Sequence, residues 1–348
     1  MPRDVKTDDG KSVSIVGWGM GWPEPRDSKS SVRKTGKRLR DGEINIENMA
    51  LLNRWRAAHG YIINTFQASL RRRTKGTRIT VGQRLKRSAT IIDKLQQGRS
   101  VDLWSMHDIA GIRLIFGDTE QLYRFRDDFH SSRAKHILQN DVDRYDYIKA
   151  PKESGYRGVH DVYAYQAIAP GGDPWNGLLI EIQYRTRVQH AWATAVEMSD
   201  MINGGRTKFS NGDVDNYRFF QLSSELLART FEGRVSCLPD LSRKQLVDEW
   251  KSTETEHKFF AQLQHLAKQD IAKLIIRFSI LVIDNAGELS VETGFTYREA
   301  LSRMISLESQ HPDWDVVLVN GDEDSVRSSY RNYFGNASEF IEYMEASL

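Results

Sequence analysis

The segment Leu178-Leu-Ile-Glu181-Ile-Gln183-Tyr184 has the alternation of a β-strand that is buried on one side only. Successive side chains of a strand point to opposite faces, so Glu181, Gln183 and Arg185 share one face and the apolar residues between them share the other. A carboxylate beside an apolar layer is costly unless it is paired or bound to a metal. The segment therefore predicts a strand with a polar, functional face.

Two more strands are predicted at 111–116 and 161–168, both rich in Ile, Leu, Val and Tyr. A helix is predicted over 87–96, before the first of these strands. Asp108 is expected just before its strand, because in a regular strand from 108 it would point away from Arg113. These elements predict an α/β-like unit over 77–205.

The flanks have other patterns. Residues 1–76 predict a helical region, with one helix starting at Ser28 or Ser30 and another over about 47–70. Residues 206–276 predict long helices, about 217–235 and 242–276, and residues 277–348 a small ββαβα domain. The fold class is therefore α+β, with four regions: 1–76, 77–205, 206–276 and 277–348. We expect the last region to control the activity and to take no part in the chemistry.

Composition narrows the class of protein. No run of 18 apolar residues and no secretory signal is present, so no membrane partner is expected. The single cysteine, Cys237, excludes an internal disulfide and fits a cytoplasmic protein. The net charge is only +2 in 348 residues, yet basic residues cluster at 33–40 and 71–78. These clusters indicate either an anionic partner or solvated helix faces.

Cations and carboxylates recur between positions 84 and 190. Lys86, Thr90 and Lys94 are spaced by four residues and, with Arg84, can reach the phosphates of a nucleotide. The alternative for this helix is a plain amphipathic helix with a basic outer face. The alternative for Arg113 is a salt bridge on the solvent side of its strand. Asp108 and Glu181 supply the hard oxygen ligands that suit Mg²⁺ held together with substrate phosphates.

An aromatic residue stands among further cations. Gly155 permits a sharp loop that exposes the Tyr156 ring as a stacking platform for a base. A buried core tyrosine is the usual alternative, but four basic side chains lie within a dozen residues: Lys149, Lys152, Arg157 and His160.

In order, spacing and chemistry, these segments resemble the synthetase domain of the RelA/SpoT family, over about 77–205. The resemblance implies a nucleotidyltransferase (polymerase β-like) mixed sheet flanked by helices. It also implies transfer of the β,γ-pyrophosphate of ATP to the 3′-hydroxyl of GDP or GTP, making (p)ppGpp. The expected Mg²⁺ and catalytic residues are Asp108 and Glu181. Expected ATP contacts are Arg84, Lys86, Thr90, Lys94 and Arg113, and expected acceptor contacts are Tyr156, Lys149, Lys152, Arg157, His160, Gln183 and Arg185.

The chain also departs from the family. Gly158-Val159 stands where the family commonly has Ser-Leu. The His107-Asp108 dipeptide is better explained by the synthetase motif than by a hydrolase centre. The tail of the long ribosome-associated members is not recognisable, so the chain resembles a small alarmone synthetase with extra flanks, of which some relatives are toxins or phage-defence proteins.

Several alternatives stay open. The acceptor is either a guanine nucleotide, an adenine nucleotide or the 3′ CCA end of tRNA, which the basic clusters would serve. A regulatory protein or antitoxin and a homo-oligomer are further possible partners. Transfer of a nucleoside monophosphate is disfavoured, because the chain lacks the expected Gly-Ser dipeptide. A non-catalytic nucleotide or RNA sensor would not require both carboxylates.

Overall fold

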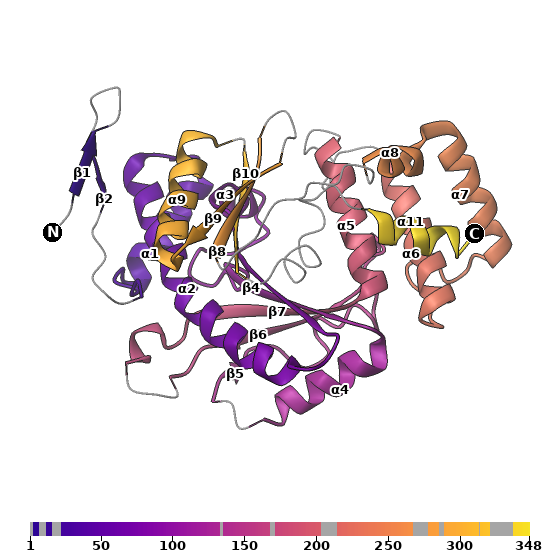
Figure 1. Cartoon of the computed structure of the whole chain (residues 1–348), viewed down its shortest axis with the longest axis horizontal. Helices are drawn as coiled ribbons and strands as arrows, with labels where there is room; N and C mark the ends of the chain where they lie inside the picture. The colour runs from indigo at the N-terminus through magenta and orange to yellow at the C-terminus, as the bar shows by residue number, and fades with distance from the viewer. Residues whose placement is uncertain are drawn as a thin grey trace.

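A five-stranded mixed sheet lies at the centre of the chain, in the order β3-β4-β7-β6-β5 (Figure 1). Its strands are β3 Thr80–Leu85, β4 Ala110–Phe116, β5 Ile137–Leu138, β6 Val159–Ala164 and β7 Leu179–Thr186. Strands β4 and β7 pair in parallel and the other neighbours are antiparallel. The computed structural model describes residues 3–6, 12–15, 22–132, 135–167, 171–202, 214–266, 278–284, 289–312, 314–320 and 337–348.

One face of this sheet is apolar and buried. Ile112 of β4 and Ile180 and Ile182 of β7 are at most 1% exposed. The helices α2 Ile46–Thr74 and α4 Thr119–His130 pack on this side, below the sheet in Figure 1. The alternation read from the sequence matches the chemistry of the two faces, since the apolar side chains of β4 and β7 face these helices, while the polar side of β7 is also largely buried, with Glu181 7% and Arg185 5% exposed.

The N-terminal helices begin where the sequence predicts. Helix α1 Lys29–Arg40 is capped by Ser28, whose side chain accepts a hydrogen bond from Ser31 N. Helix α3 Ser88–Gln96 lies between β3 and β4. The elements not predicted are β3, β5, α4, the helix at 187–202, the short helix η1 Asp173–Trp175, and the pair β1 Arg3–Lys6 and β2 Ser12–Ile15.

Five helices form a second core, on the right in Figure 1: α5 Arg187–Ile202, α6 Val214–Phe231, α7 Arg243–His257, α8 Phe259–Leu266 and α11 Ser338–Glu345. The predicted helix over 242–276 is interrupted at Lys258, which has a left-handed φ of 59°. The Glu254 side chain then accepts hydrogen bonds from Phe260 N and Ala261 N and starts α8. Residues 267–276 of that prediction lie outside the described residues.

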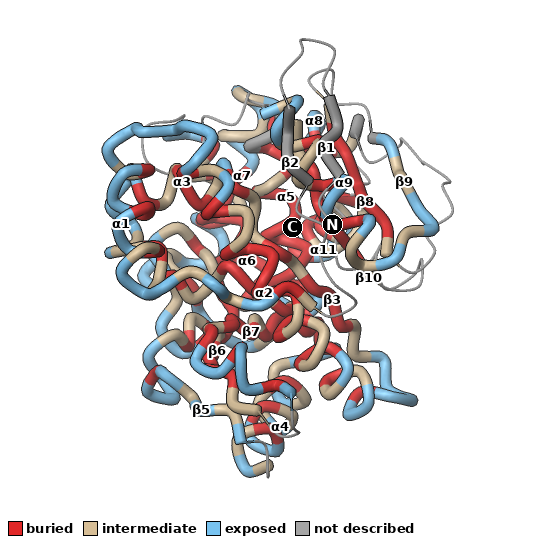
Figure 2. Tube along the Cα trace, turned by 90° about the vertical axis from the view of Figure 1, so that its left-hand side faces the viewer, coloured by how far each residue is buried: buried red, intermediate tan, exposed pale blue. Residues whose placement is uncertain are grey.

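The remaining elements are β8 Phe278–Ile283, β9 Leu289–Phe295, α9 Tyr297–Gln310 and β10 Asp315–Asn320, with the antiparallel order β10-β8-β9. Together with α11 they give the predicted ββαβα order. Their apolar residues, such as Ile280 and Val316, lie in the same buried core as α2 and the central sheet, whereas α11 lies in the second core. Figure 2 shows in red the buried stretches of the elements that form these two cores.

The predicted mixed α+β fold, a mixed sheet flanked by helices, is confirmed. The predicted boundaries at 205/206 and 276/277 fall outside the described residues. Among the described helices, none has the length and apolar character that a membrane span needs.

Candidate active site

Strand register gathers the polar residues on the second face of the sheet. Glu181 and Gln183 of β7 stand beside Gly111 and Arg113 of β4. On the other side of β7, His160 of β6 pairs with Gln183. Because paired residues project from the same face, side chains from three strands converge there. Arg84 of β3 joins them through its pairing with Gly111.

A carboxylate between two lysines forms one half of the site. Asp108 Oδ2 accepts hydrogen bonds from Lys86 Nζ at 3.0 Å and from Lys94 Nζ at 2.8 Å. Asp108 precedes β4, as predicted. Lys86 lies in the connection between β3 and α3, so of the three predicted helix residues only Thr90 and Lys94 lie on α3. Burial, followed by the charges of Arg84 and Lys94, lowers the pKa of Lys86 in spite of Asp108. This half of the site is therefore crowded with cations.

A continuous chain of hydrogen bonds forms the other half. Arg185 donates from Nε and Nη2 to the Tyr156 hydroxyl at 3.2 and 3.1 Å. That hydroxyl lies 2.6 Å from His160 Nε2, and His160 Nδ1 donates to Glu181 Oε1 at 3.1 Å. Gln183 Nε2 donates to the other oxygen of Glu181 at 2.7 Å. The aromatic platform and the carboxylate on the strand are thus directly connected.

The charges along this chain stabilise one another. Burial lowers the pKa of His160, but Tyr156 and Glu181 more than offset it and raise that pKa to about 9. Burial raises the pKa of Tyr156, yet Arg185 and His160 outweigh it and bring that pKa from 10.0 to about 8. Burial also opposes ionisation of Glu181, but His160 and His107 hold its pKa far below the usual range. Near neutral pH, Glu181 is therefore an anion beside a charged imidazolium.

The loop 152–158, which we call the acceptor loop, presents Tyr156. Gly155 has a φ of +85°, as a sharp turn requires, and this agrees with its predicted role. Gly158 has a φ of +150°, and a Cβ there would lie 3.1 Å from the Tyr156 hydroxyl. The glycine that replaces the family's serine therefore permits the close approach of Tyr156. The Lys152 ammonium lies 5.3 Å from the Tyr156 ring centroid.

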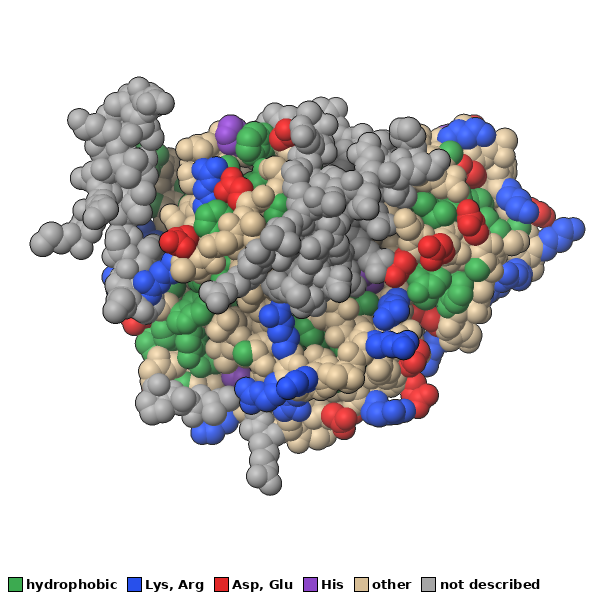
Figure 3. All heavy atoms as spheres, in the orientation of Figure 1, with side chains coloured by type: hydrophobic (Ala, Val, Ile, Leu, Met, Phe, Trp, Pro, Cys, Tyr) green, Lys and Arg blue, Asp and Glu red, His purple; other side chains and the backbone are tan. Residues whose placement is uncertain are grey.

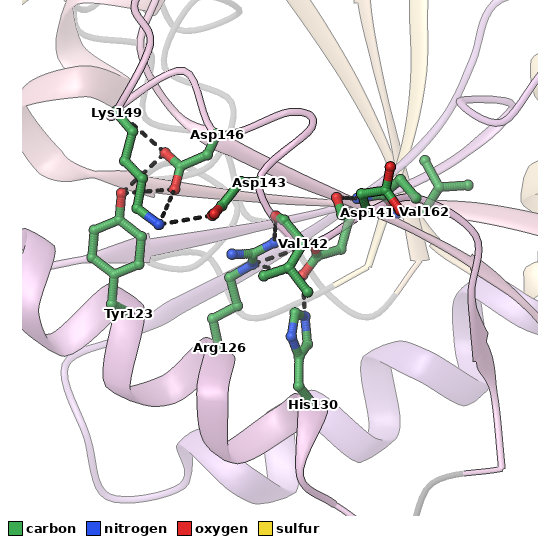
Figure 4. Close-up of polar contacts among 11 residues, drawn as sticks. Tyr123, Arg126, His130, Asp141, Val142, Asp143, Asp146, Lys149 and Val162 are labelled. Carbon is green, nitrogen blue, oxygen red and sulfur yellow. Dashed lines mark hydrogen bonds and ion pairs between the residues drawn. The ribbon is translucent and has the colours of Figure 1, made fainter.

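Two predicted acceptor residues are not brought to this face. Arg157 is 3% exposed and forms an ion pair with Glu232, at the end of α6. Lys149 lies over the Tyr123 ring of α4, and its ammonium binds Asp143 at 2.7 Å and lies near Asp146, both in the segment that follows β5 (Figure 4). Both had been predicted from proximity in sequence to Tyr156.

Two side chains beside the site were not predicted. His107 Nε2 lies 3.9 Å from Glu181 Oε1, although its dipeptide with Asp108 had been noted only as a possible hydrolase motif. The Tyr147 ring lies edge-on to Tyr156, with 5.8 Å between centroids, and carries Lys152 at 4.3 Å. The sequence signal for Tyr147 was its position three residues after Arg144 in a segment already rich in cations and aromatics.

The residues present fit a magnesium ion that is shared with substrate phosphates. Asp108 Oδ1 is buried and has no hydrogen-bond partner in the part of the chain that the structure describes, so it suits a ligand role. Burial and the charge of the neighbouring Glu181 oppose ionisation of Asp108, but Lys86 and Lys94 outweigh them and lower its pKa. Within the described ranges, no three His, Cys, Asp or Glu side chains gather to hold a metal by themselves. Mg²⁺ commonly takes one or two carboxylates and completes its shell with phosphates and water.

Comparison with known proteins now identifies this part of the chain. Residues 83–201 match the family model described as "Region found in RelA / SpoT proteins". The match covers about a third of the chain, and we refer to residues 83–201, which are similar to that family, as the RelA/SpoT region. The RelA/SpoT region contains Asp108, Glu181 and Tyr156, and the family resemblance expected from the sequence is confirmed.

Two curated relatives match over this region. GTP pyrophosphokinase YjbM of Bacillus subtilis is 35% identical over 117 residues, which cover 32% of this chain and 51% of that protein. Probable GTP diphosphokinase RSH3, chloroplastic, of Oryza sativa is 31% identical over 96 residues, 27% of this chain and 12% of that protein. The chain therefore spans about half the length of the first relative and a small part of the second.

Among solved structures, the small alarmone synthetase 1 from Bacillus subtilis bound to its product pppGpp aligns with 50% of this chain and 90% of its own. The TM-score of this alignment is 0.43 and the sequence identity 25%.

Proposed function

We propose that this protein transfers the β,γ-pyrophosphate of ATP to the 3′-hydroxyl of a guanine nucleotide, GDP or GTP, and so makes (p)ppGpp. The observation that carries the proposal is the meeting of two half-sites on one face of the RelA/SpoT region. One is the carboxylate held by two lysines, and the other is the chain from Tyr156 to Glu181. The names of both curated relatives, a GTP pyrophosphokinase and a GTP diphosphokinase, support the same reaction class.

The cationic half-site suits the ATP phosphates. Lys86 and Lys94 have ammonium groups within hydrogen-bond distance of Asp108, and Arg84 and Arg113 share the adjacent strand face. A bound Mg²⁺, held by Asp108 and Glu181, would neutralise charge on the phosphates. The protein contributes position and positive charge, which are the main needs of phosphoryl-type transfer.

The aromatic half-site suits the acceptor. The Tyr156 ring is half-buried against the second core, and its remaining exposed surface is the one that we assign to stacking of a base, while its hydroxyl is fixed by Arg185 and His160. Glu181 lies at the end of that chain, where its carboxylate can polarise and orient the 3′-hydroxyl directly or through one water; because its pKa is held far below the usual range, the hydroxyl proton passes on to solvent. The 3′-oxygen then bonds to the β-phosphorus, the bond from that phosphorus to the oxygen bridging to the α-phosphate breaks, and AMP leaves.

A tRNA 3′ end is the second acceptor that the assay must include. Figure 3 shows Lys and Arg side chains gathered along the lower half of the displayed face. Such a surface attracts an extended polyanion more than it attracts a free nucleotide.

The test uses ATP labelled on the β- or the γ-phosphate, with GDP, GTP, ATP or tRNA as separate acceptors. Both labels should appear in the guanine nucleotide, with one AMP formed per product, and 3′-deoxyguanosine triphosphate should accept none. Release of ADP in place of AMP would contradict pyrophosphoryl transfer. Labelling of tRNA alone would refute the guanine nucleotide as acceptor, and ATP binding without any transfer would indicate a non-catalytic sensor.

A further inference from the structure

Both half-sites are held in place by buried carboxylates that lie outside residues 83–201. We propose that Glu308 and Glu232 are positioning residues for the proposed reaction: Glu308 fixes the phosphate-binding segment at α3, and Glu232 fixes the acceptor loop. The inference rests on the proposed function for its substrates, and on the contacts below for its geometry.

Glu308 of α9 reaches the start of α3 through Arg56 of α2. The Arg56 guanidinium is fully buried and donates to Glu308 Oε2 at 2.7 Å and Oε1 at 2.9 Å. The same guanidinium donates from Nε to the carbonyl of Lys86 at 2.9 Å. Ser88, the first residue of α3, donates from Oγ to Glu308 Oε2 at 2.5 Å. One carboxylate therefore restrains both the backbone of Lys86 and the helix that carries Lys94.

The N-terminus of α3 is held by Glu308 through Ser88 and, among the described residues, has no side-chain cap from its N-cap residue. Its N-cap residue, Arg87, makes no side-chain capping hydrogen bond. Unpaired N–H groups and the partial positive charge at a helix N-terminus favour a nearby anion, and Glu308 supplies one. Arg87 also binds Asp315 of β10 at 2.9 Å, a second contact from the same C-terminal elements.

Glu232 has the equivalent place on the acceptor side. One of its oxygens binds Arg157 Nη1, next to Tyr156 in the chain. The other accepts from Thr186 Oγ1 at 2.8 Å, at the end of β7, and from Gln189 Nε2 at 2.9 Å, in α5. The side chains of Arg157 and Glu232 are 3% and 4% exposed. The carboxylate thus ties the acceptor loop to the strand that carries Glu181.

Helix α6 continues this contact along the acceptor loop. Ser224 donates from Oγ to the carbonyl of Gly155 at 2.6 Å, and Gln221 donates to the carbonyl of Glu153 at 2.7 Å. A Cβ at Gly155 would lie 2.8 Å from Ser224 Cβ, so loop and helix are in direct contact. Since α9 belongs to the first core and α6 to the second, each restraint can be removed separately.

The experiment compares Glu308→Gln and Glu232→Gln in the full chain, by separate titrations of a non-hydrolysable ATP analogue and of GDP. Glu308→Gln should raise the Kd for the ATP analogue about tenfold or more, since misplacement by about 1 Å can cost as much as about 100-fold. Its Kd for GDP should change less than about twofold. Glu232→Gln should instead raise the Kd for GDP and change the Kd for the ATP analogue less than about twofold. Matched controls are Glu292→Gln and Glu249→Gln, which break partly exposed ion pairs with Arg303 of α9 and Arg218 of α6 and should alter neither Kd.

Thermal melting must first show that each variant is folded, because a buried arginine left unpaired is destabilising. If a glutamine variant does not fold, Ser88→Ala or Thr186→Val removes one contact of the same carboxylate and should give the same selectivity more weakly. Folded variants that weaken both ligands equally, or neither, would overturn the proposal.

Hydrogen exchange without nucleotide separates this inference from the proposed function. Glu308→Gln should speed exchange in 88–96 and not in 152–158, and Glu232→Gln the reverse. If the wild type binds no nucleotide and makes no product but these exchange patterns hold, the function is wrong and the restraints are right. Unchanged exchange in both segments would refute the restraints, whatever the activity.

Discussion

Replacing Asp108 by asparagine tests the phosphate half of the site. The amide keeps the size of the carboxylate but removes the charge that lies between Lys86 Nζ and Lys94 Nζ, 3.0 and 2.8 Å away. It also converts the unpartnered Oδ1 position into a poorer ligand for a metal. Removing one preorganised electrostatic group costs about 2.7–4 kcal/mol in the transition state, so kcat should fall about 100- to 1000-fold.

The fold should survive this substitution. The side chains of Lys86, Lys94 and Asp108 are 13%, 19% and 17% exposed, so their pairing is neither at the surface nor fully buried. We expect a loss of about 1–2 kcal/mol in the free energy of unfolding, between the values for exposed and buried pairs.

The assay is the initial rate of AMP release with ATP, Mg²⁺ and the acceptor, together with a thermal melt. Asp93→Asn is the matched control, because Asp93 lies next to Lys94 on α3 but pairs with Arg99 at the surface, where the side chains are 46% and 52% exposed. Its rate should stay within about twofold of the wild type. A folded Asp108→Asn protein with near-normal turnover would refute the assignment of Asp108 to metal and phosphate binding.

Three further predictions concern the acceptor and the fold. Tyr156→Ala should weaken acceptor binding by about 1–3 kcal/mol through the lost stack and leave the Kd for ATP unchanged; equal weakening of both ligands in titrations would contradict the division of the site. Gly158→Ala, strained at φ +150° and in contact with the Tyr156 hydroxyl, should reduce acceptor binding and lower the free energy of unfolding by about 1 kcal/mol or more, measured in urea. Burial opposes ionisation of Asp161, but His130 and Arg126 lower its pKa below 3.8, so it stabilises the fold above that pH and this stability is lost as the pH falls through the folded-state pKa. The fall in unfolding free energy between pH 5 and pH 2–3 should be shallower for Asp161→Asn than for the wild type.

The sequence by itself determined the local elements and the chemistry that they carry. Alternation in 178–184 predicted which side chains of β7 share a face, and the opposite parity of Asp108 and Arg113 in a regular strand placed Asp108 just before β4. Gly155 predicted a turn that only a residue tolerant of positive φ can make. All of these depend on a residue and its near neighbours, and periodicity reports them directly.

Only the tertiary structure decided which of these side chains meet. His160 reaches Glu181 because β6 pairs with β7 in one register, whereas Arg157, three residues earlier, is drawn to Glu232 on another helix. Arg56 and Glu308 are 252 positions apart, and no local pattern links them. A segment's sequence specifies the face that a side chain takes on its own element, but the partner on that face depends on how elements distant in sequence pack together.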